Sequence, residues 1–299
     1  MASNPRENIL SIEWSARVLE RSDRRVGAIL LEEGKLAAEN IEQVMSLQQT
    51  SGLRFGEAAV RLGLITEDDV RGAVAKQYDL PHLVPGSESI SREIVVAYEP
   101  FDPRAEELRG LRTQLQIRWD KAQVEHRTLA VVSPGCGEGR SYVAANLAVV
   151  FAQLGERTLL VDADLRSPRQ HRIFNVSDRV GLAAVLSGRA DRGAVAPVRE
   201  FGRLSLLAAG APPPNPQELI SRPAALAGFL RELWHDFDVI LLDTPPAKFY
   251  ADALSVAHRA GSAVVIARKD HTRVADATGL VRELSDSGVR VVGTTLNVF

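Results

Sequence analysis

Short, nearly continuous apolar runs alternate with longer helical patterns through the second part of the chain. The apolar runs fall at 128–133, 158–162, 204–208, 238–243, 262–267 and 291–297. Apolar strands separated by helices predict an α/β fold, in which a mostly parallel sheet is flanked by helices on both faces. In such sheets ligands bind at the carboxyl ends of the strands, so the residues after each run are candidates for function.

The first part of the chain instead repeats a helical pattern. A 24-residue stretch at 25–48 returns at 54–77 with a constant offset of 29, so that Gly27 matches Gly56 and Gly34 matches Gly63. A fixed offset held over many positions indicates duplicated structural units. Each copy predicts a short helix, a glycine turn and a second helix.

Changes in composition predict the domain limits. Residues 1–24 are polar and mixed in charge, which predicts a disordered segment or a short helix. Proline and glycine residues within 84–105 predict a linker with one short ordered piece. We therefore expect a small helical repeat domain over 25–83 and, after the linker, an α/β domain over 106–299.

Bulk composition narrows the class of protein. The 299 residues are 45% hydrophobic and 25% charged with a formal net charge of −2, so a soluble globular protein is expected and nucleic acid is not expected as a partner. A single cysteine, Cys136, excludes an internal disulfide and fits a reducing cytoplasm. Because no apolar run approaches about 18 residues and no signal-peptide core is present, we expect a cytoplasmic protein that meets a membrane only through a partner.

The loop after the first apolar run carries the clearest chemistry. In TLAVVSPGCGEGRS (128–141), glycines at 135, 137 and 139 precede Arg140 and Ser141, and a helical pattern follows. Glycine lets backbone N–H groups approach a phosphate, and the N-terminus of the helix adds partial positive charge. A hydroxyl group directly after such a loop can reach a phosphate-bound Mg²⁺ ion.

Pro134 and Arg140 replace the glycine and lysine of the strict phosphate-loop pattern, so two other interpretations stay open. The loop can be an ordinary strand–helix turn that uses glycine for its shape. A dinucleotide-binding loop is the second alternative, although it needs a further glycine at position 140. Arginine keeps the positive charge of lysine, but its guanidinium group is planar and bulkier.

Three aspartates follow two of the apolar runs. Asp162 and Asp164 lie at the end of the run at 158–162, and Asp243 ends the run at 238–243. Because parallel strands end at the same edge of a sheet, we expect these carboxylates to lie beside the glycine loop, where carboxylates hold Mg²⁺ and its waters. A dinucleotide site would explain Asp162 through a ribose contact, but it leaves Asp243 without a role.

These residues resemble the motifs of a known family. The stretches LLVDADLRSPRQH (159–171), SLLAAGAPPPNPQELI (205–220) and DVILLDTPP (238–246) are similar to motifs of the cytoplasmic domain of bacterial tyrosine autokinases, which are relatives of P-loop ATPases and control exopolysaccharide chain length and export. The resemblance implies bound ATP and Mg²⁺. In this family pattern Ser141, Asp164 and Asp243 would place the metal, and Asp162 would orient or deprotonate the tyrosine hydroxyl. The implied nucleotide site comprises Gly135, Cys136, Gly137, Glu138, Gly139, Arg140, Ser141, Tyr142, Arg268 and Asn297, with Arg140 also acting in catalysis.

The segment EELRGLRT (106–113) places Glu106, Arg109 and Arg112 along one stripe of a predicted helix. Taken alone, this stripe is typical of a solvated charged face. In the autokinases the pattern E-x-x-R-x-x-R docks one subunit against the next. The resemblance therefore implies a homo-oligomeric ring.

The repeated pattern resembles the N-terminal domain of type II secretion and pilus-assembly ATPases. One branch of that domain family binds cyclic di-GMP through two tandem 24-residue motifs separated by five residues, and the spacer here, 49–53, is also five residues long. The implied ligand contacts are Arg25, Gln48, Arg54 and Gln77, while Ala59 departs from the leucine of the pattern. The alternative is a helical domain that contacts only a protein partner.

The combined layout resembles the exopolysaccharide kinases encoded with exosortase-type systems of Gram-negative bacteria. We expect an ATP-dependent protein-tyrosine kinase that regulates exopolysaccharide chain length and works with a membrane chain-length determinant protein. Arg140 departs from the family's loop lysine, and the sequence after the last predicted strand lacks the family's tyrosine cluster, which weakens the expectation of self-phosphorylation. An ATP-binding scaffold and an ATPase switch that reports cyclic di-GMP are the alternatives.

Overall fold

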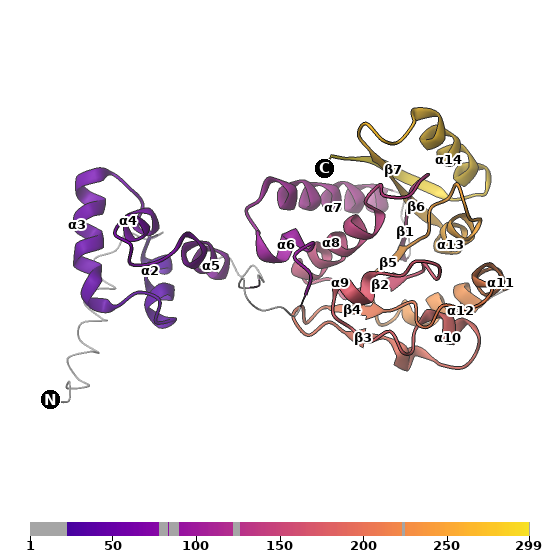
Figure 1. Ribbon diagram of the computed structural model, residues 1–299, viewed down its shortest axis with the longest axis horizontal. Helices are drawn as coiled ribbons and strands as arrows, with labels where there is room; N and C mark the ends of the chain where they lie inside the picture. The colour runs from indigo at the N-terminus through magenta and orange to yellow at the C-terminus, as the bar shows by residue number, and fades with distance from the viewer. Residues whose placement is uncertain (1–22, 78–82, 84–89, 122–125, 223–224, 299) are drawn as a thin grey trace. The chain divides into compact units, whose positions relative to one another are not determined.

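The computed structural model describes residues 23–77, 83, 90–121, 126–222 and 225–298 (Figure 1). The chain separates into two compact units, Met1–Val84 and Pro85–Phe299, which are described here one at a time. The predicted terminal segment 1–24 lies outside the described residues except for its last two positions, which begin a helix. Within the described ranges no helix combines the length and the apolar character that a bilayer span requires.

The first unit is helical. Its elements are α2 (Asp23–Glu32), the 3-10 turn η1 (Ala38–Asn40), α3 (Ile41–Ser51), α4 (Phe55–Arg61) and α5 (Glu67–Gln77). The two sequence copies form the same turn, because Gly34 and Gly63 both adopt a left-handed conformation, with φ of 65° and 69°. The backbone bond from Lys35 N to Leu30 O recurs 29 residues later, from Leu64 N to Ala59 O.

The core of the first unit lies between the two copies. Helix α2 packs on α5, and α3 packs on α4, so each first helix covers the second helix of the other copy. Leu30, Val44 and Phe55 are buried in this core. Gly56 is required for close packing of α4 on α5, because a Cβ atom at this position would lie 2.7 Å from Cγ1 of Val70.

Within its described residues, the second unit contains a seven-stranded sheet in the order β3-β4-β2-β5-β1-β6-β7. The strands are β1 (Arg127–Val132), β2 (Thr158–Asp162), β3 (Ala196–Pro197), β4 (Leu204–Leu207), β5 (Val239–Asp243), β6 (Ser262–Arg268) and β7 (Arg290–Asn297). All neighbouring pairs are parallel except β3 with β4. The predicted α/β fold with a mostly parallel sheet is confirmed.

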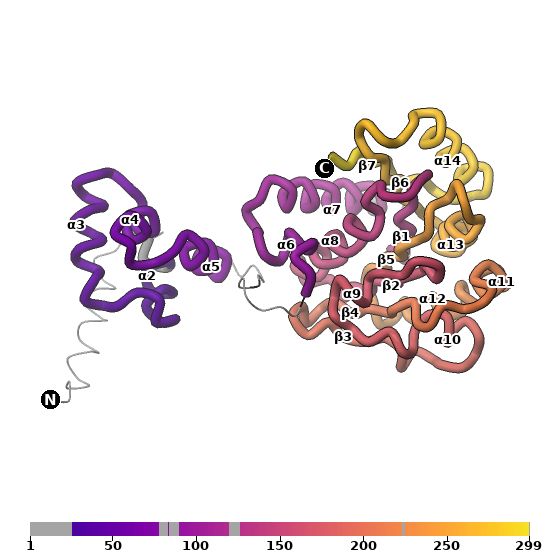
Figure 2. The backbone as a smooth tube through the Cα atoms, in the orientation of Figure 1, coloured from indigo at the N-terminus to yellow at the C-terminus, as the bar shows by residue number. Residues whose placement is uncertain are grey.

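Helices cover both faces of this sheet (Figure 2). They are α6 (Val95–Tyr98), α7 (Pro103–Lys121), α8 (Arg140–Gln153), α9 (Gln170–Ile173), α10 (Leu182–Leu186), η2 (Arg192–Ala194), α11 (Pro216–Ser221), α12 (Ala225–Leu233), α13 (Asp252–Ala260) and α14 (Val274–Asp286). Helix α8 packs on β1, β2 and β5 and carries α7 on its outer side. On the other face, apolar residues of α12, α13 and α14 pack against alternate strand residues such as Leu159 and Val161.

The segment before α7 is part of the second unit from residue 90 onward. Its apolar residues Ile94, Val96 and Ala97 are fully buried. The side chain of Asn146 on α8 is buried as well, and it donates to the carbonyl of Glu93 over 2.9 Å. A buried amide needs such partners, so this bond fixes the backbone of the segment on α8.

Candidate functional site

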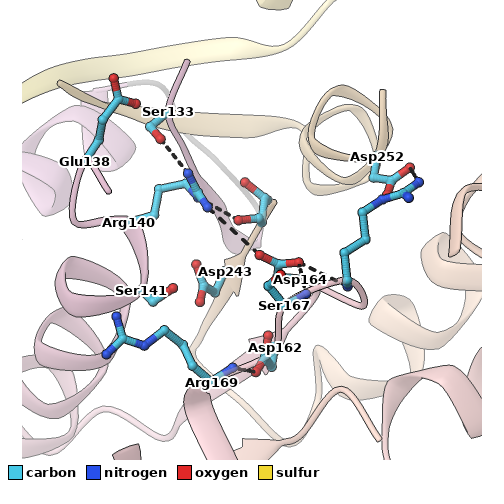
Figure 3. A network of polar contacts seen from close by, with 12 residues as sticks. Ser133, Glu138, Arg140, Ser141, Asp162, Asp164, Ser167, Arg169, Asp243 and Asp252 are labelled. Atoms are coloured by element: carbon cyan, nitrogen blue, oxygen red, sulfur yellow. Dashed lines mark hydrogen bonds and ion pairs between the residues drawn. The ribbon is translucent and has the colours of Figure 1, made fainter. Parts of the chain in front are cut away.

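The carboxyl ends of the central strands bring the predicted chemistry to one edge of the sheet. Asp162 ends β2 and is paired in register with Asp243, which ends the neighbouring strand β5. Strand β1 lies on the other side of β5, and its chain runs directly into the glycine loop. The loop and the carboxylates, which are far apart in the sequence, therefore face the same space above the sheet (Figure 3).

Glycine is needed within the loop for its backbone conformation. Gly137 and Gly139 have φ values of 68° and 92°, in the left-handed region that disfavours a side chain. Gly139 is also the residue from which α8 begins. The loop thus delivers its last backbone N–H groups to the N-terminus of a long helix, where an anion is favoured.

Side chains from β6, β7 and the loop after β6 hold the outside of the glycine loop. His271 Nε2 lies 3.1 Å from the carbonyl oxygen of Cys136, Arg268 Nη1 donates to that of Gly137 over 3.0 Å, and Asn297 Nδ2 donates to that of Glu138 over 3.2 Å. Three successive carbonyls are therefore occupied by protein donors. The sequence indicated Arg268 and Asn297, whereas nothing in the pattern pointed to His271.

Glu138 lies inside the protein, not on the surface of the loop. Only 2% of the residue is exposed, and its carboxylate accepts hydrogen bonds from the N–H of Gly135, over 2.6 Å, and from the hydroxyl of Thr272. The carboxylate braces the loop from within. The family pattern predicted that Glu138 contacts the nucleotide, and this contact stays a prediction. The sequence did not identify Thr272 as a partner of Glu138.

Arg140 is also held by the protein. The residue is 8% exposed, and its guanidinium donates to Thr244 O over 2.6 Å, to Ser133 Oγ over 2.6 Å and to Gly135 O over 2.9 Å. Nη2 lies 4.0 Å from a carboxylate oxygen of Asp164. One side chain thus links the glycine loop to the residue after β5 and to the loop after β2, a geometry that suits a planar fork of donors.

Gln170 connects the two in-register aspartates. Its backbone N–H donates to Asp162 Oδ2 over 2.9 Å, while its side-chain Nε2 donates to Asp243 Oδ2 over 2.7 Å and to the carbonyl of Ser141 over 3.1 Å. The residue is completely buried. Sequence patterns did not identify Gln170, because its place depends on how the loop after β2 folds back over the strand ends.

The loop after β2 is fixed at a second place. Asp164 accepts from the N–H groups of Arg166 and Ser167, over 3.1 and 2.9 Å. The guanidinium of Arg166 lies 2.6 Å from a carboxylate oxygen of Asp252, at the start of α13, and stacks over the ring of Tyr250. Asp164 therefore lies in a hydrogen-bonded turn near Arg140 of the glycine loop.

Burial sets the protonation behaviour of the aspartate pair. Loss of solvent raises the pKa of Asp162 well above its ordinary value, and the neighbouring charge of Asp243 raises it further. Burial also raises the pKa of Asp243, although the Arg140 charge and the hydrogen bonds from Gln170 and Ser141 act in the opposite direction. A carboxylate with a raised pKa is a better proton acceptor near neutral pH than an exposed one.

The donor set fits Mg²⁺ together with phosphate and water. Among the described residues, Asp162 Oδ1, Asp243 Oδ1 and Gln170 Oε1 are buried oxygen atoms without a hydrogen-bond partner in the protein. Within the same residues no three acidic, histidine or cysteine side chains are close enough to chelate an ion on their own. Mg²⁺ usually keeps several waters and takes one or two carboxylates plus substrate phosphates, which matches this arrangement.

A cavity of about 800 Å³ opens beside the glycine loop. Gly137, Gly139 and Tyr142 line it from the loop and α8, and Arg268 and Asn297 line it from the ends of β6 and β7. Apolar side chains complete the wall, namely Leu108, Leu111, Val143, Leu296 and Val298. Its size and its mixture of apolar walls with a few polar groups are typical of a small-molecule site.

The predicted subunit-contact stripe on α7 is partly engaged within the chain. Arg109 donates to the carbonyl of Pro100 over 2.7 Å and pairs with Glu106 over 3.3 Å, and Arg112 donates to the carbonyl of Val150 over 2.9 Å. The Glu106 side chain is 79% exposed, whereas that of Arg109 is 18% exposed. Glu106 is therefore the member of the stripe that is freest to contact another molecule.

The predicted cyclic di-GMP residues lie on the first unit. Arg54 is exposed immediately before α4, while Gln48 and Gln77 are half-buried on α3 and α5. The side chain of Arg25 is outside the described residues. Their role in binding stays a prediction.

Comparisons with known proteins identify the family of the second unit. Residues 124–298 match the ParA family model, described as the NUBPL iron-transfer P-loop NTPase. The tyrosine-protein kinase YwqD of Bacillus subtilis is 31% identical over 212 residues, which are 70% of this chain and 86% of that protein. The crystal structure of the chimerical protein CapA2B2 superposes with a TM-score of 0.64 at 30% identity, covering 76% of this chain and 97% of that one.

Other matches differ in length or in bound ligand. The chain spans only 31% of a Klebsiella pneumoniae relative and 27% of the tyrosine-protein kinase etk of Escherichia coli. The septum site-determining protein MinD of Pyrococcus horikoshii, solved with Mg-ADP, is 26% identical with a TM-score of 0.51 over 57% of this chain and 70% of that one. P-loop neighbours of this fold thus bind adenine nucleotide with Mg²⁺. The matched family model and the YwqD relationship together show that this chain belongs to the bacterial tyrosine-protein kinases, within the ParA-type P-loop NTPases.

Proposed function

We propose that this chain is an ATP-dependent protein-tyrosine kinase. The observation that carries the proposal is the in-register pair Asp162–Asp243 beside the glycine loop, whose buried Oδ1 atoms have no hydrogen-bond partner in the described part of the chain. These oxygens suit the waters of a phosphate-bound Mg²⁺. Membership of the bacterial tyrosine-protein kinases supports tyrosine hydroxyls as the acceptor class.

The chain's own residues supply position and charge. The N–H groups of 135–140 and the N-terminus of α8 would bind the phosphates, and Arg140 keeps the loop in shape through Ser133 and Thr244. Ser141 and Asp243 would hold Mg²⁺ directly or through water, with Asp164 at its waters; the ion neutralises phosphate charge when bound. Asp162 would accept the proton of the tyrosine hydroxyl, a role that its raised pKa favours.

The cavity beside the loop is the proposed nucleoside site. Leu296 and Val298 offer apolar contacts for a purine ring, and Asn297 lies between them with an amide that can hydrogen-bond its edge. Asn297 also donates to the Glu138 carbonyl, which ties the base site to the phosphate loop. Binding of the base would therefore favour the loop geometry that the phosphates need.

The biological setting that we propose is control of exopolysaccharide chain length and export. One relative, from Klebsiella pneumoniae, is named as a tyrosine-protein kinase in the cps region. We propose a cytoplasmic protein, held at the inner membrane by a membrane chain-length determinant protein. The exposed Glu106 on α7 supports assembly of copies into a ring through the charged stripe.

We further propose that the first unit binds cyclic di-GMP. The two sequence copies make equivalent turns around Gly34 and Gly63, so they offer two similar surfaces to a ligand with two similar halves. The exposed guanidinium of Arg54 is suited to a phosphate or to the face of a guanine. Under this proposal the unit would report the nucleotide signal to the kinase.

Incubation of the full chain with ATP labelled at the γ-phosphate, Mg²⁺ and a tyrosine-rich peptide tests the kinase proposal. Label on peptide or protein tyrosine is the expected result. Release of free labelled phosphate alone would favour the ATPase switch, and neither product would favour the ATP-binding scaffold. An Asp162→Asn variant that transfers phosphate as fast as the parent would remove Asp162 from its proposed role.

A further inference from the structure

An ion pair between Glu93 and Arg169 stands on the wall of the proposed nucleotide cavity. Arg169 Nη2 lies 2.8 Å from both carboxylate oxygens of Glu93. Both residues line the same cavity as Gly137 and Gly139 of the glycine loop. The site described above gives neither side chain a role.

The backbone of Arg169 is fixed close to the phosphate end of the site. Its N–H group donates to Asp162 Oδ2 over 3.1 Å, and the next residue, Gln170, contacts both Ser141 and Asp243. The side chain is 46% exposed. Figure 3 shows it extending past Ser141, on the side of the aspartates that faces α8. Arg169 thus directly precedes the residue that contacts Ser141, the expected partner of the Mg²⁺-bound phosphates, and it lines the cavity.

Two other arginines, Arg104 and Arg268, line the cavity, while Arg140 is buried and is not part of its lining. Arg104 pairs with Asp102, and Arg268 donates to the carbonyl of Gly137. Arg140 is buried by its bonds to the glycine loop and Thr244. Of the arginines that line the described cavity, Arg169 is the one paired with a carboxylate, Glu93, that lines the cavity as well.

The position of Glu93 is set by the segment that leads into the second unit. Asn146, which is buried on α8, holds the Glu93 carbonyl, and the N–H of Ser91 donates to the carbonyl of Ile173 at the end of α9. The segment is thus attached both to α8 and to the end of α9. The Glu93 carboxylate is itself 42% exposed, so it can leave Arg169 while its backbone stays attached.

We propose that Arg169 is a further triphosphate-binding residue, which contacts the terminal phosphate, and that Glu93 competes with this phosphate for its guanidinium. This inference rests on the proposed binding of ATP. An exposed ion pair is weak, because water screens both partners, so the exchange is easily made. A terminal phosphate carries more charge than a carboxylate and makes stronger hydrogen bonds to guanidinium.

Titration calorimetry on the full chain tests the proposed roles of Arg169 and Glu93. The chain is titrated in the presence of Mg²⁺ with a non-hydrolysable ATP analogue and, separately, with ADP. Arg169→Gln should weaken binding of the triphosphate about tenfold and leave ADP within about twofold, because only the terminal phosphate is lost as a contact. Glu93→Gln should tighten binding of the triphosphate about threefold. The double variant should bind like Arg169→Gln alone, since Glu93 acts only through Arg169.

The matched control is Arg172→Gln, which removes an exposed arginine from α9, the short helix that follows Arg169, and should change neither affinity. A tighter-binding Glu93→Gln protein cannot be explained by misfolding. Equal losses for ADP and the triphosphate in Arg169→Gln, or no loss for either, would overturn the inference. Failure of the parent chain to bind either nucleotide would instead overturn the proposed kinase function.

Discussion

Nε of Arg140 lies 2.6 Å from the carbonyl oxygen of Thr244, although 104 positions separate the two residues. The same guanidinium donates to Ser133 and Gly135 on the glycine loop. The residue that replaces the usual loop lysine therefore ties the loop to the end of β5. A lysine ammonium is a compact point charge and cannot span these acceptors at once.

We predict that Arg140→Lys lowers the free energy of unfolding by about 1–3 kcal/mol, because buried acceptors lose charge-assisted hydrogen bonds. Urea unfolding followed by circular dichroism measures the change. Arg282→Lys, on the exposed face of α14, is the matched control and should leave the midpoint unchanged. Equal stability of Arg140→Lys and the parent would show that the hydrogen bonds of the Arg140 guanidinium do not stabilise the fold.

The sequence predicted the sheet, and it predicted that the glycine loop and the strand-end aspartates would lie close together. Both predictions follow from local rules. Apolar runs set the strands, and parallel strands of similar length bring their ends to one edge, which places Asp162 opposite Asp243. The two-residue strand β3 is too short to leave a periodic pattern, so it was not predicted.

The contacts that loops make could not be predicted from the pattern of apolar runs. Gln170 bonds to both aspartates only because the chain after β2 turns back over the strand ends. Glu93 reaches Arg169 from a segment 76 residues earlier, and no periodicity encodes that distance. The buried apolar run at 94–97 was the one available signal that this part of the predicted linker is ordered.

The aspartate pair predicts how stability depends on pH. Burial raises the folded-state pKa of Asp162 and of Asp243, while in the unfolded chain both ionise near about pH 4. Between that pH and the raised values the folded protein binds more protons, so its stability falls as pH rises, by up to about 1.4 kcal/mol per pH unit for one proton.

Asp162→Asn should therefore be more stable than the parent at pH 8 in metal-free buffer, with a flatter profile between pH 5 and pH 8. Thermal unfolding over this range provides the measurement. Asp286→Asn, at an exposed position on α14, should retain the parent profile. A parent chain whose stability increases through this window would contradict the raised pKa values.

The charged stripe on α7 yields a prediction about assembly. Glu106 is exposed and Arg112 is bonded to the Val150 carbonyl, so Glu106→Lys should lower the mass of the oligomer without lowering the melting temperature. Arg112→Ala should lower the melting temperature as well, because an internal hydrogen bond is lost. Light scattering and thermal unfolding measure the two effects.

Glu283→Lys on α14 makes the same charge change at another exposed position and controls for net charge. If the parent is monomeric, or if Glu106→Lys keeps the parent mass, the stripe is a solvated face of the helix and not a subunit contact.

Cyclic di-GMP binding by the first unit is tested by calorimetry on the full chain. We expect Arg54→Ala and Gln77→Ala each to weaken binding by at least tenfold, because charged and amide hydrogen bonds to the ligand are lost. Arg61→Ala, at an exposed position at the end of α4, should bind like the parent. A folded parent that gives no heat at high micromolar ligand would exclude the proposal.

The attachment of Asn146 to the Glu93 backbone has a mechanical consequence. Asn146 lies within the first two turns of α8, the helix that begins at the glycine loop. An α-helix is stiff over such a length, so a displacement of the backbone at Glu93 would be passed on to the end of α8 at the glycine loop. A force that reaches Glu93 would therefore also act on the glycine loop, through α8.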